Sequence, residues 1–267
     1  ANGSRSCVYA GLSGRLSGIP VIWHVRETIR DYFLYDMLLG SFSKNIICVS
    51  KSVEIKRFGR FGHFIKKKIV VVYNGVDTSK LVMNKEARDN LRRKLNLNND
   101  QILFGLIGNI IPLKGQDFFL LSFAKAKKKV GDISANVLII GHSLDIPYKT
   151  RLNKLIMDNE LQDNVVFEKF SENIIDLYSA IDVFVLSSQR EGFSRSLIES
   201  MSFGLPILAS NLSEIEEAVE QKNFKKYRST GNGYERLMFY NHILIATNGD
   251  EARHGTISSD VNQFQNS

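Results

Sequence analysis

Residues 182–210 read DVFVLSSQREGFSRSLIESMSFGLPILAS, and this stretch decides the fold. Its first five residues are mostly β-branched or aromatic and predict a buried strand. Apolar residues recur at helical spacing over 195–203, and a second apolar run follows at 206–209. A strand, a helix and a second strand joined by short loops are typical of a parallel sheet with helices on its faces.

The same alternation continues on both sides of this stretch. Upstream, strands are predicted at 102–107, 135–140 and 165–167, with helices at 116–129, 148–159 and 173–180. A further helix is predicted downstream at 213–220. We therefore expect an α/β domain over residues 101–220.

An earlier Rossmann-like domain is predicted over residues 1–80. Its strands are expected at 19–24, 45–49 and 69–73, and its helices at 8–18, 30–39 and 51–57. Three strands are few for a parallel sheet covered on both faces, the sequence does not begin with Met, and the first helix lacks an obvious opening cap. We expect this domain to be incomplete at its N-terminus.

Two segments fall outside the alternation. Residues 81–100 are rich in charge and poor in strand formers, which predicts an exposed linker helix. From residue 221 the alternation stops, and we expect an atypical, poorly ordered tail over 221–267 with one strand at 242–247.

The composition excludes several classes of protein. The 267 residues are 43% hydrophobic and 24% charged, which is too apolar for a disordered chain. Two cysteines, Cys7 and Cys48, cannot form a disulfide scaffold or a four-cysteine zinc site. No apolar run is long enough to span a bilayer. These features favour a cytoplasmic location.

The net charge of +7 is a mild excess. The basic runs at 66–68 and 127–129 lack interleaved aromatic residues, which argues against nucleic-acid binding. Each run fits either a solvated face or contact with a membrane surface. The second interpretation would place the chain at the inner face of a membrane.

Two carboxylates in the opening stretch are candidate ligand-binding residues. Glu191 follows the predicted strand at its carboxyl end, where open parallel sheets bind ligands, and Glu199 lies eight residues later in the helix. The first backbone N–H groups of the helix, at Phe193, Ser194 and Arg195, favour a phosphate between the two. A nucleotide diphosphate sugar fits this layout. The alternative is that Glu191 caps the helix and Glu199 lies on a solvated face.

Four blocks of sequence resemble the family-4 glycosyltransferases of the GT-B fold. The E-G-F at 191–193 and the ESMSFGLP at 199–206 are similar to that family's E-x7-E signature. VVYNGVD at 71–77 is similar to the block that closes the acceptor domain, and GNIIPLKG at 108–115 to the phosphate-binding turn. AIDVFVLSS at 180–188 resembles the strand before the first Glu.

The resemblance implies a role for each matching residue. Glu191 would contact hydroxyls of the donor sugar, Glu199 would accept hydrogen bonds from the ribose hydroxyls, and Lys114 would hold the diphosphate. Gly192, Phe193, Ser194 and Arg195 would also belong to the donor site. His24, at the end of a predicted strand, is similar to a family His that points toward the donor sugar; the alternative is a structural His. Arg26 and Glu27 would bind the acceptor or pair with each other.

Two departures from the family pattern concern the phosphate and the base. Asn109 stands where the family commonly has Arg, so the phosphate would be held with less charge, or Arg195 would supply the second cation. Arg195 could equally be a solvated surface residue. Gly141, His142 and Ser143 replace the usual G-D-G or G-E-G, which leaves the base preference open. His142 has no His or Cys partner at metal-ligand spacing.

The resemblance implies a retaining transfer of a hexose from a nucleotide diphosphate sugar to a hydroxyl of a glycan or lipid-linked acceptor. No cofactor is expected, and the absence of a D-x-D pair favours a metal-independent reaction. The alternatives are a non-catalytic nucleotide-sugar-binding fragment and a GT-B sugar-nucleotide epimerase. Because the first domain is expected to be incomplete, we expect little transferase activity from this chain, weak donor binding and a tendency to aggregate.

Overall fold

The computed structural model describes residues 1–28, 33–61, 63–98, 100–131, 134–170, 173–219, 244–247, 252–255 and 265–266. It contains two compact units, each with its own sheet. The first unit comprises Ala1–Gly75, Arg190–Arg195 and Leu212–Ala218. The second comprises Val76–Gln189, Ser196–Asn211 and Val219–Ser267.

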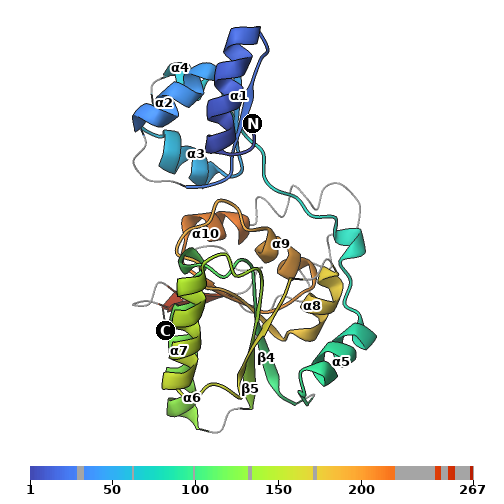
Figure 1. Ribbon diagram of the computed structural model, residues 1–267. Coiled ribbons are helices and arrows are strands. Elements are labelled where there is room, and N and C mark those ends of the chain that lie inside the picture. The colour runs from blue at the N-terminus through green and yellow to red at the C-terminus, as the bar shows by residue number, and fades with distance from the viewer. Residues whose placement is uncertain are drawn as a thin grey trace. The chain divides into compact units, whose positions relative to one another are not determined.

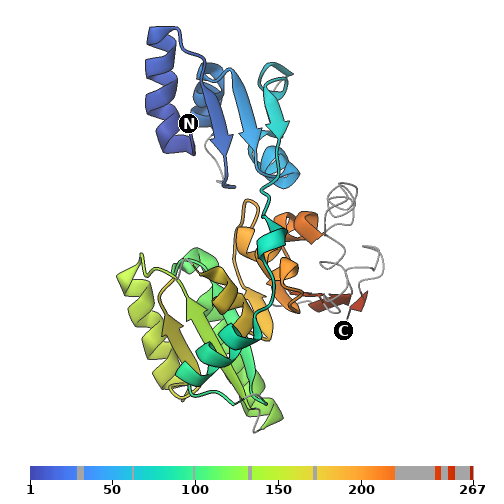
Figure 2. The ribbon, with the colours of Figure 1, turned by 90° about the vertical axis from the view of Figure 1, so that its right-hand side faces the viewer.

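The first unit is built on a parallel sheet of three strands in the order β1-β2-β3, seen beside its helices in Figure 2. The strands are β1 (Ile22–Val25), β2 (Asn45–Cys48) and β3 (Ile69–Val71). Trp23 is level with Ile46 in the register, and Ile47 is level with Val70. The helices are α1 (Ser4–Ser17), α2 (Phe33–Phe42), α3 (Lys51–Phe58) and α4 (His63–Lys66).

The start of the chain pairs with the outer edge of β1. The N–H of Gly3 donates to the carbonyl of His24 at 2.9 Å, and the N–H of His24 donates to the carbonyl of Ala1 at 2.9 Å. This pairing places α1 four residues earlier than the pattern predicted, because Gly3 takes a positive φ and turns the chain directly into the helix. The four-residue α4 was not predicted, since one turn is too short to show periodicity.

A buried ion pair lies in the core of the first unit. Trp23 and Phe58 pack edge to face with their ring centroids 5.6 Å apart. Arg57 lies over the Trp23 ring and donates two hydrogen bonds to Asp36, at 2.6 and 2.7 Å. The paired guanidinium and carboxylate satisfy one another where neither is exposed to water.

A segment far along the chain completes this unit. Helix α10 (Ser213–Val219) contributes Glu217, whose carboxylate accepts the N–H groups of Lys51 and Ser52 at 2.6 and 2.7 Å. Negative charge is favourable at the start of a helix, here α3. Glu214 of the same helix pairs with Lys56 at 2.8 Å.

The second unit contains an eight-stranded sheet in the order β11-β10-β9-β8-β7-β4-β5-β6. Its parallel part comprises β4 (Ile102–Ile107), β5 (Ala135–Ile140), β6 (Val165–Glu168), β7 (Val183–Leu186), β8 (Ile207–Ser210) and β9 (Leu244–Thr247). The helices of this unit are α5 (Lys85–Lys94), α6 (Gln116–Val130), α7 (Ile146–Asp158), α8 (Ile174–Ala180) and α9 (Arg195–Ser202), the last beginning in the first unit. Among the described residues, no helix has the length and apolarity needed to cross a bilayer.

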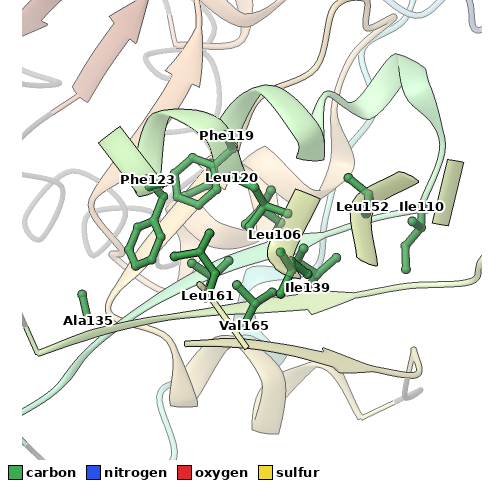
Figure 3. Packing of buried hydrophobic residues seen from close by; sticks show 14 of the residues in the cluster. Leu106, Ile110, Phe119, Leu120, Phe123, Ala135, Ile139, Leu152, Leu161 and Val165 are labelled. Carbon is green, nitrogen blue, oxygen red and sulfur yellow. The ribbon is translucent and has the colours of Figure 1, made fainter. Parts of the chain in front are cut away.

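The core of the second unit lies between its sheet and helices α6 and α7, as Figure 3 shows. All six residues of β5 are buried, which agrees with a strand covered on both faces. Leu120 of α6, Leu152 of α7 and Ile139 of β5 are fully buried in one apolar cluster. Phe119 and Phe123 of α6 belong to the same cluster. The helices and strands predicted for 101–219 agree closely with these elements.

The prediction of a single strand after residue 221 was wrong. β9 agrees with it, but β10 (Ala252–Gly255) and β11 (Gln265–Asn266) follow as antiparallel strands. Both are short and polar, so neither shows the apolar run by which buried strands are recognised. The remainder of the predicted tail, residues 221–243, 248–251, 256–264 and 267, lies outside the described residues.

Helix α5 is less exposed than its charge predicted. Arg92 is 1% exposed; its guanidinium donates to Asp182 at 2.9 Å and to the carbonyl of Ala180 at 3.1 Å. Arg88 reaches the same carboxylate at 2.6 Å. The burial of Arg92 was not predicted, and it is possible because an acidic residue and backbone carbonyls before β7 compensate the charge. The outer residues of the helix, Lys85, Glu86, Asn90, Arg93 and Lys94, are exposed as expected. Figure 1 shows α5 beside α8.

Candidate functional site

The strand order of the second unit places a switch point between β4 and β7. From β4 the chain adds β5 and β6 on one side of the sheet, and then β7, β8 and β9 on the other. Ligands of open parallel sheets bind beyond the carboxyl ends of the strands at such a point. The loop after β4 carries the GNIIPLKG block at 108–115, and the loop after β7 carries the EGF at 191–193.

These two loops contact each other directly. The hydroxyl of Ser187, after β7, donates to the carbonyl of Lys114 at 3.0 Å. The N–H of Gln189 donates to the carbonyl of Leu113 at 2.9 Å. The turn that carries Lys114 is therefore fixed against the start of the loop that leads to residue 191.

The turn itself is a short 3₁₀ helix, Pro112–Lys114, closed by Gly115. Gly115 has φ +63°, and a Cβ on it would overlap the carbonyl oxygen of Ser187. Only glycine allows this approach at that backbone conformation. Lys114 is half-buried just before the start of α6, whereas Asn109 is exposed and its carbonyl accepts a hydrogen bond from Gln116 at 2.9 Å.

Glu199 is 8% exposed in the middle of α9. The phenolic hydroxyl of Tyr178 donates to its Oε2 at 2.9 Å, and Tyr178 itself stacks on Phe203 with centroids 5.1 Å apart. The alternative that Glu199 lies on a solvated face is therefore wrong. A buried carboxylate needs hydrogen-bond donors, and the helix presents this one to a Tyr of the neighbouring α8.

The loop Arg190–Arg195 belongs to the first unit, where three successive carbonyls accept hydrogen bonds. Thr28 donates to the carbonyl of Glu191 at 3.1 Å, Ser50 to that of Gly192 at 2.8 Å, and Asn74 to that of Phe193 at 3.0 Å. Each donor follows one strand of the first sheet.

Close packing accompanies these hydrogen bonds. A Cβ on Gly192 would overlap the carbonyl oxygen of Arg26, so glycine is required for the approach. The Phe193 ring packs on Tyr73 with centroids 5.2 Å apart. Of the predicted donor-binding residues, Gly192, Phe193 and Ser194 are buried, Glu191 is half-buried and Arg195 is exposed.

His24 lies within β1 and is half-buried in the first unit. Burial lowers its pKa, and the nearby charges of Arg26 and the chain's amino terminus lower it further. A neutral imidazole is both a donor and an acceptor of a hydrogen bond. Arg26 and Glu27, after the strand, are exposed.

Metal ligands do not gather in the described part of the chain. Among these residues, no group of three or more His, Cys, Asp or Glu side chains could hold an ion. His142 is exposed after β5, with its ring near that of Phe170 at 6.1 Å between centroids.

The structure thus brings Lys114 into the second unit's switch point, gives Glu199 a Tyr partner there, and places the loop of Glu191 in the same unit as His24. Sequence reasoning missed the donors Thr28, Ser50 and Tyr178. Thr28 and Ser50 bind backbone carbonyls, which leave no side-chain pattern to detect. The position of Ser50 directly before a predicted helix was the one available signal, since serine is a preferred helix cap.

Comparisons with known proteins agree on a family. The family model described as glycosyl transferases group 1 matches residues 87–234. The O-antigen biosynthesis glycosyltransferase WclY of Escherichia coli is 28% identical over 151 residues, which cover 57% of this chain and 40% of that protein. A UDP-Gal:alpha-D-GlcNAc-diphosphoundecaprenol alpha-1,3-galactosyltransferase, also of Escherichia coli, is 25% identical over 235 residues, covering 79% and 56%. The chain spans about half the length of these relatives or less.

Solved structures agree on the fold. HepE of Anabaena, in complex with UDP and glucose, has a TM-score of 0.72 at 19% identity, over 80% of this chain and 59% of that one. Sucrose-phosphate synthase of Thermosynechococcus elongatus has a TM-score of 0.66 at 16% identity, over 90% and 68%. The predicted class, two Rossmann-like sheets of GT-B type, is confirmed.

Proposed function

Because this chain belongs to the glycosyl transferases group 1 family, we propose that it serves the transfer of a hexose from a nucleotide diphosphate sugar to a hydroxyl of a glycan or lipid-linked acceptor. The observation that carries the proposal is the switch point between β4 and β7. At this point a hydrogen bond joins the Lys114 turn to the loop that leads to Glu191. Open parallel sheets bind their ligands at such a point.

Lys114 would hold the diphosphate. The leaving nucleotide gains negative charge as the glycosidic bond breaks, and a fixed cation stabilises that charge more in the transition state than before it. The start of α6, directly after the Lys114 turn, adds backbone N–H groups and the positive end of a fifteen-residue helix. Asn109 and Arg195 would complete the anion site with an amide and an exposed guanidinium.

Each of the two carboxylates would bind one sugar of the donor, the ribose or the hexose. Glu199, oriented by Tyr178, would accept hydrogen bonds from the ribose hydroxyls. Glu191, next to Gly192, would contact the hexose, and the backbone N–H groups of Phe193 and Ser194 would face the diphosphate. We infer a family-4 type reaction with retention at the anomeric carbon, which proceeds without a metal ion.

His24 would act on the acceptor side. Its lowered pKa keeps the imidazole neutral at pH 7, so it would orient a hydroxyl by hydrogen bonding rather than by charge. Arg26 and Glu27, exposed just beyond the strand, would bind the acceptor.

Donor binding is the first test. Titration calorimetry on the full chain with UDP-glucose, GDP-mannose, UDP and GDP should identify a nucleotide that binds. Lys114→Ala should weaken that binding at least tenfold, whereas Lys128→Ala, on the exposed end of α6, should leave it unchanged. Equal affinities in wild type and Lys114→Ala would show that the diphosphate is bound elsewhere.

Product analysis separates the proposed transfer from its alternatives. Multiple-turnover release of nucleotide that depends on an acceptor, persists in EDTA and falls at least a hundredfold in Glu191→Gln would support it, and an α-linked product from an α-linked donor would support retention. Conversion of the donor sugar without transfer would indicate an epimerase. Binding without either product would indicate that this chain binds the donor but does not by itself transfer the sugar.

Membrane-surface contact would use the basic run at 66–68. Lys68 is engaged, since its ammonium donates to the carbonyls of Gly40 and Ser43 at 3.0 and 2.9 Å, but Lys66 and Lys67 are exposed. Co-sedimentation with phosphatidylglycerol vesicles should fall in Lys66→Glu/Lys67→Glu and not in Lys128→Glu/Lys129→Glu. Equal loss in both variants would indicate attraction by net charge alone.

A further inference from the structure

We propose that Thr28, Ser50 and Asn74 are positioning residues that orient the Glu191 side chain by holding the backbone of its loop. The inference rests on the proposed contact of Glu191 with the donor sugar. The hydrogen bonds to the carbonyls of Glu191, Gly192 and Phe193 measure 3.1, 2.8 and 3.0 Å.

The three donors form a regular series. They come from the segments that follow β1, β2 and β3, three neighbouring parallel strands whose carboxyl ends share one edge of the first sheet. Their three acceptors are consecutive along the loop. The loop therefore accepts one hydrogen bond from the segment that follows each strand.

This arrangement fixes more than the position of the loop. A trans peptide is planar, with its C=O and N–H groups pointing in opposite directions. Carbonyls held by the strand ends therefore direct the N–H groups of Gly192, Phe193 and Ser194 away from those ends. The first of these planes contains the Cα of Glu191, so the hydrogen bond from Thr28 holds the atom from which the Glu191 side chain projects.

Two features show that the contact is specific. Gly192 lies so close to the strand ends that a Cβ would overlap the carbonyl oxygen of Arg26, so the loop has no room to slide inward. Ser50 is fully buried. Since Ser50 also caps α3 by accepting the N–H of Val53 at 3.1 Å, Thr28 and Asn74 are the cleaner probes of positioning.

The test compares the affinity of the full chain for UDP-glucose with its affinity for UDP, measured by calorimetry, with GDP-mannose and GDP as a second pair. The change of this ratio between the wild type and a variant reports the sugar contact, because the difference in terminal phosphate between UDP-glucose and UDP is the same for every variant. Thr28→Val and Asn74→Leu, which keep the approximate shape, remove the donor and add no charge, should each lower the ratio at least threefold and leave the affinity for the nucleotide diphosphate unchanged. Thr28→Ser should restore it.

A double-mutant cycle separates positioning from general stability. In a Glu191→Gln background, Thr28→Val should have no further effect on the ratio, because the side chain that it orients has lost its charge. Ser43→Ala is the matched control: its buried hydroxyl also donates to a carbonyl of the first unit, that of Leu39 at 2.8 Å, away from the loop.

The outcomes are distinct. If neither nucleotide pair binds to the wild-type chain, the proposed function fails for uracil and guanine nucleotides, and the inference fails with it. If Glu191→Gln lowers the ratio but Thr28→Val and Asn74→Leu do not, the inference alone is overturned. It is also overturned if these variants lower both affinities together with the melting temperature, as Ser43→Ala would if its effect were purely structural.

Discussion

The phenolic oxygen of Tyr178 lies 2.9 Å from Oε2 of Glu199, and both side chains are buried in the second unit. The same hydroxyl lies 3.2 Å from the carbonyl of Ser196, one turn before Glu199 on α9. An ionised carboxylate in such surroundings depends on donors that remain in place. Tyr178 is held by its stacking on Phe203, so it fixes the direction of the carboxylate without depending on a ligand.

Tyr178→Phe should weaken binding of the nucleotide diphosphate about tenfold or more, since a hydrogen bond to a charged group contributes about 1.5–3 kcal/mol. The loss should vanish for the 2′,3′-dideoxy analogue of the same nucleotide, which offers no hydroxyls to Glu199. Titration calorimetry of both ligands checks this. Lys56→Met is the control, because that ammonium also binds a carboxylate, Glu214 at 2.8 Å, in the first unit. An equal loss for both ligands would contradict the ribose role.

Gly115→Ala should destabilise the second unit far more than an ordinary loop substitution. A left-handed backbone conformation costs a non-glycine residue about 1–2 kcal/mol, and here the added methyl also overlaps the Ser187 carbonyl oxygen. Gly18→Ala is the control: Gly18 has φ +67° with nothing within 4 Å of an added Cβ. Urea unfolding should show the larger loss for Gly115→Ala. Equal losses would mean that the loop moves away from the turn at little cost.

The second unit could be predicted in detail because its strands carry continuous apolar runs. Residues 135–140 become a strand buried on both faces, which is the environment that their sequence indicates. The backbone hydrogen bonds of the loop at Glu191 could not be predicted, since Thr28 and Ser50 are common loop residues whose partners are carbonyls more than a hundred residues away. The burial of Glu199 and of Arg92 escaped prediction for a related reason: charge predicts exposure unless the partner in space is known.

Arg92→Ala should be strongly destabilising although Arg92 lies on a highly charged helix. It would leave Asp182 with a single Arg partner and remove donors from the carbonyls of Ala180 and Asn98. A hydrogen bond to a charged group contributes about 1.5–3 kcal/mol, and because Asp182 is 27% exposed and keeps Arg88, we expect a loss of about 2–3 kcal/mol. Arg93→Ala, at the exposed neighbouring position, should cost under about 0.5 kcal/mol. Chemical denaturation of the two variants compares them directly, and similar midpoints would mean that α5 detaches without cost.

Lys149→Met should stabilise the chain at pH 7. The Lys149 ammonium lies over the Phe167 ring with no hydrogen-bond partner among the described residues, and burial lowers its pKa to about 8 from 10.5. A folded-state pKa below the unfolded value means that the folded state prefers the neutral amine. At pH 7 the charge is present in both states and its burial opposes folding, so Met should raise the unfolding free energy by about 1 kcal/mol after allowance for solvent screening.

This gain should shrink with pH. As the pH rises from 8 toward 10.5, the folded wild type loses the ammonium before the unfolded chain does, and wild-type stability rises relative to the variant. Urea unfolding at pH 7.0 and pH 9.5 measures the difference at both ends, with Lys128→Met, an exposed lysine on α6, as the control that should show no such trend. A gain that is equal at both pH values would show that Met stabilises by packing, and that the Lys149 ammonium is hydrated in the folded protein.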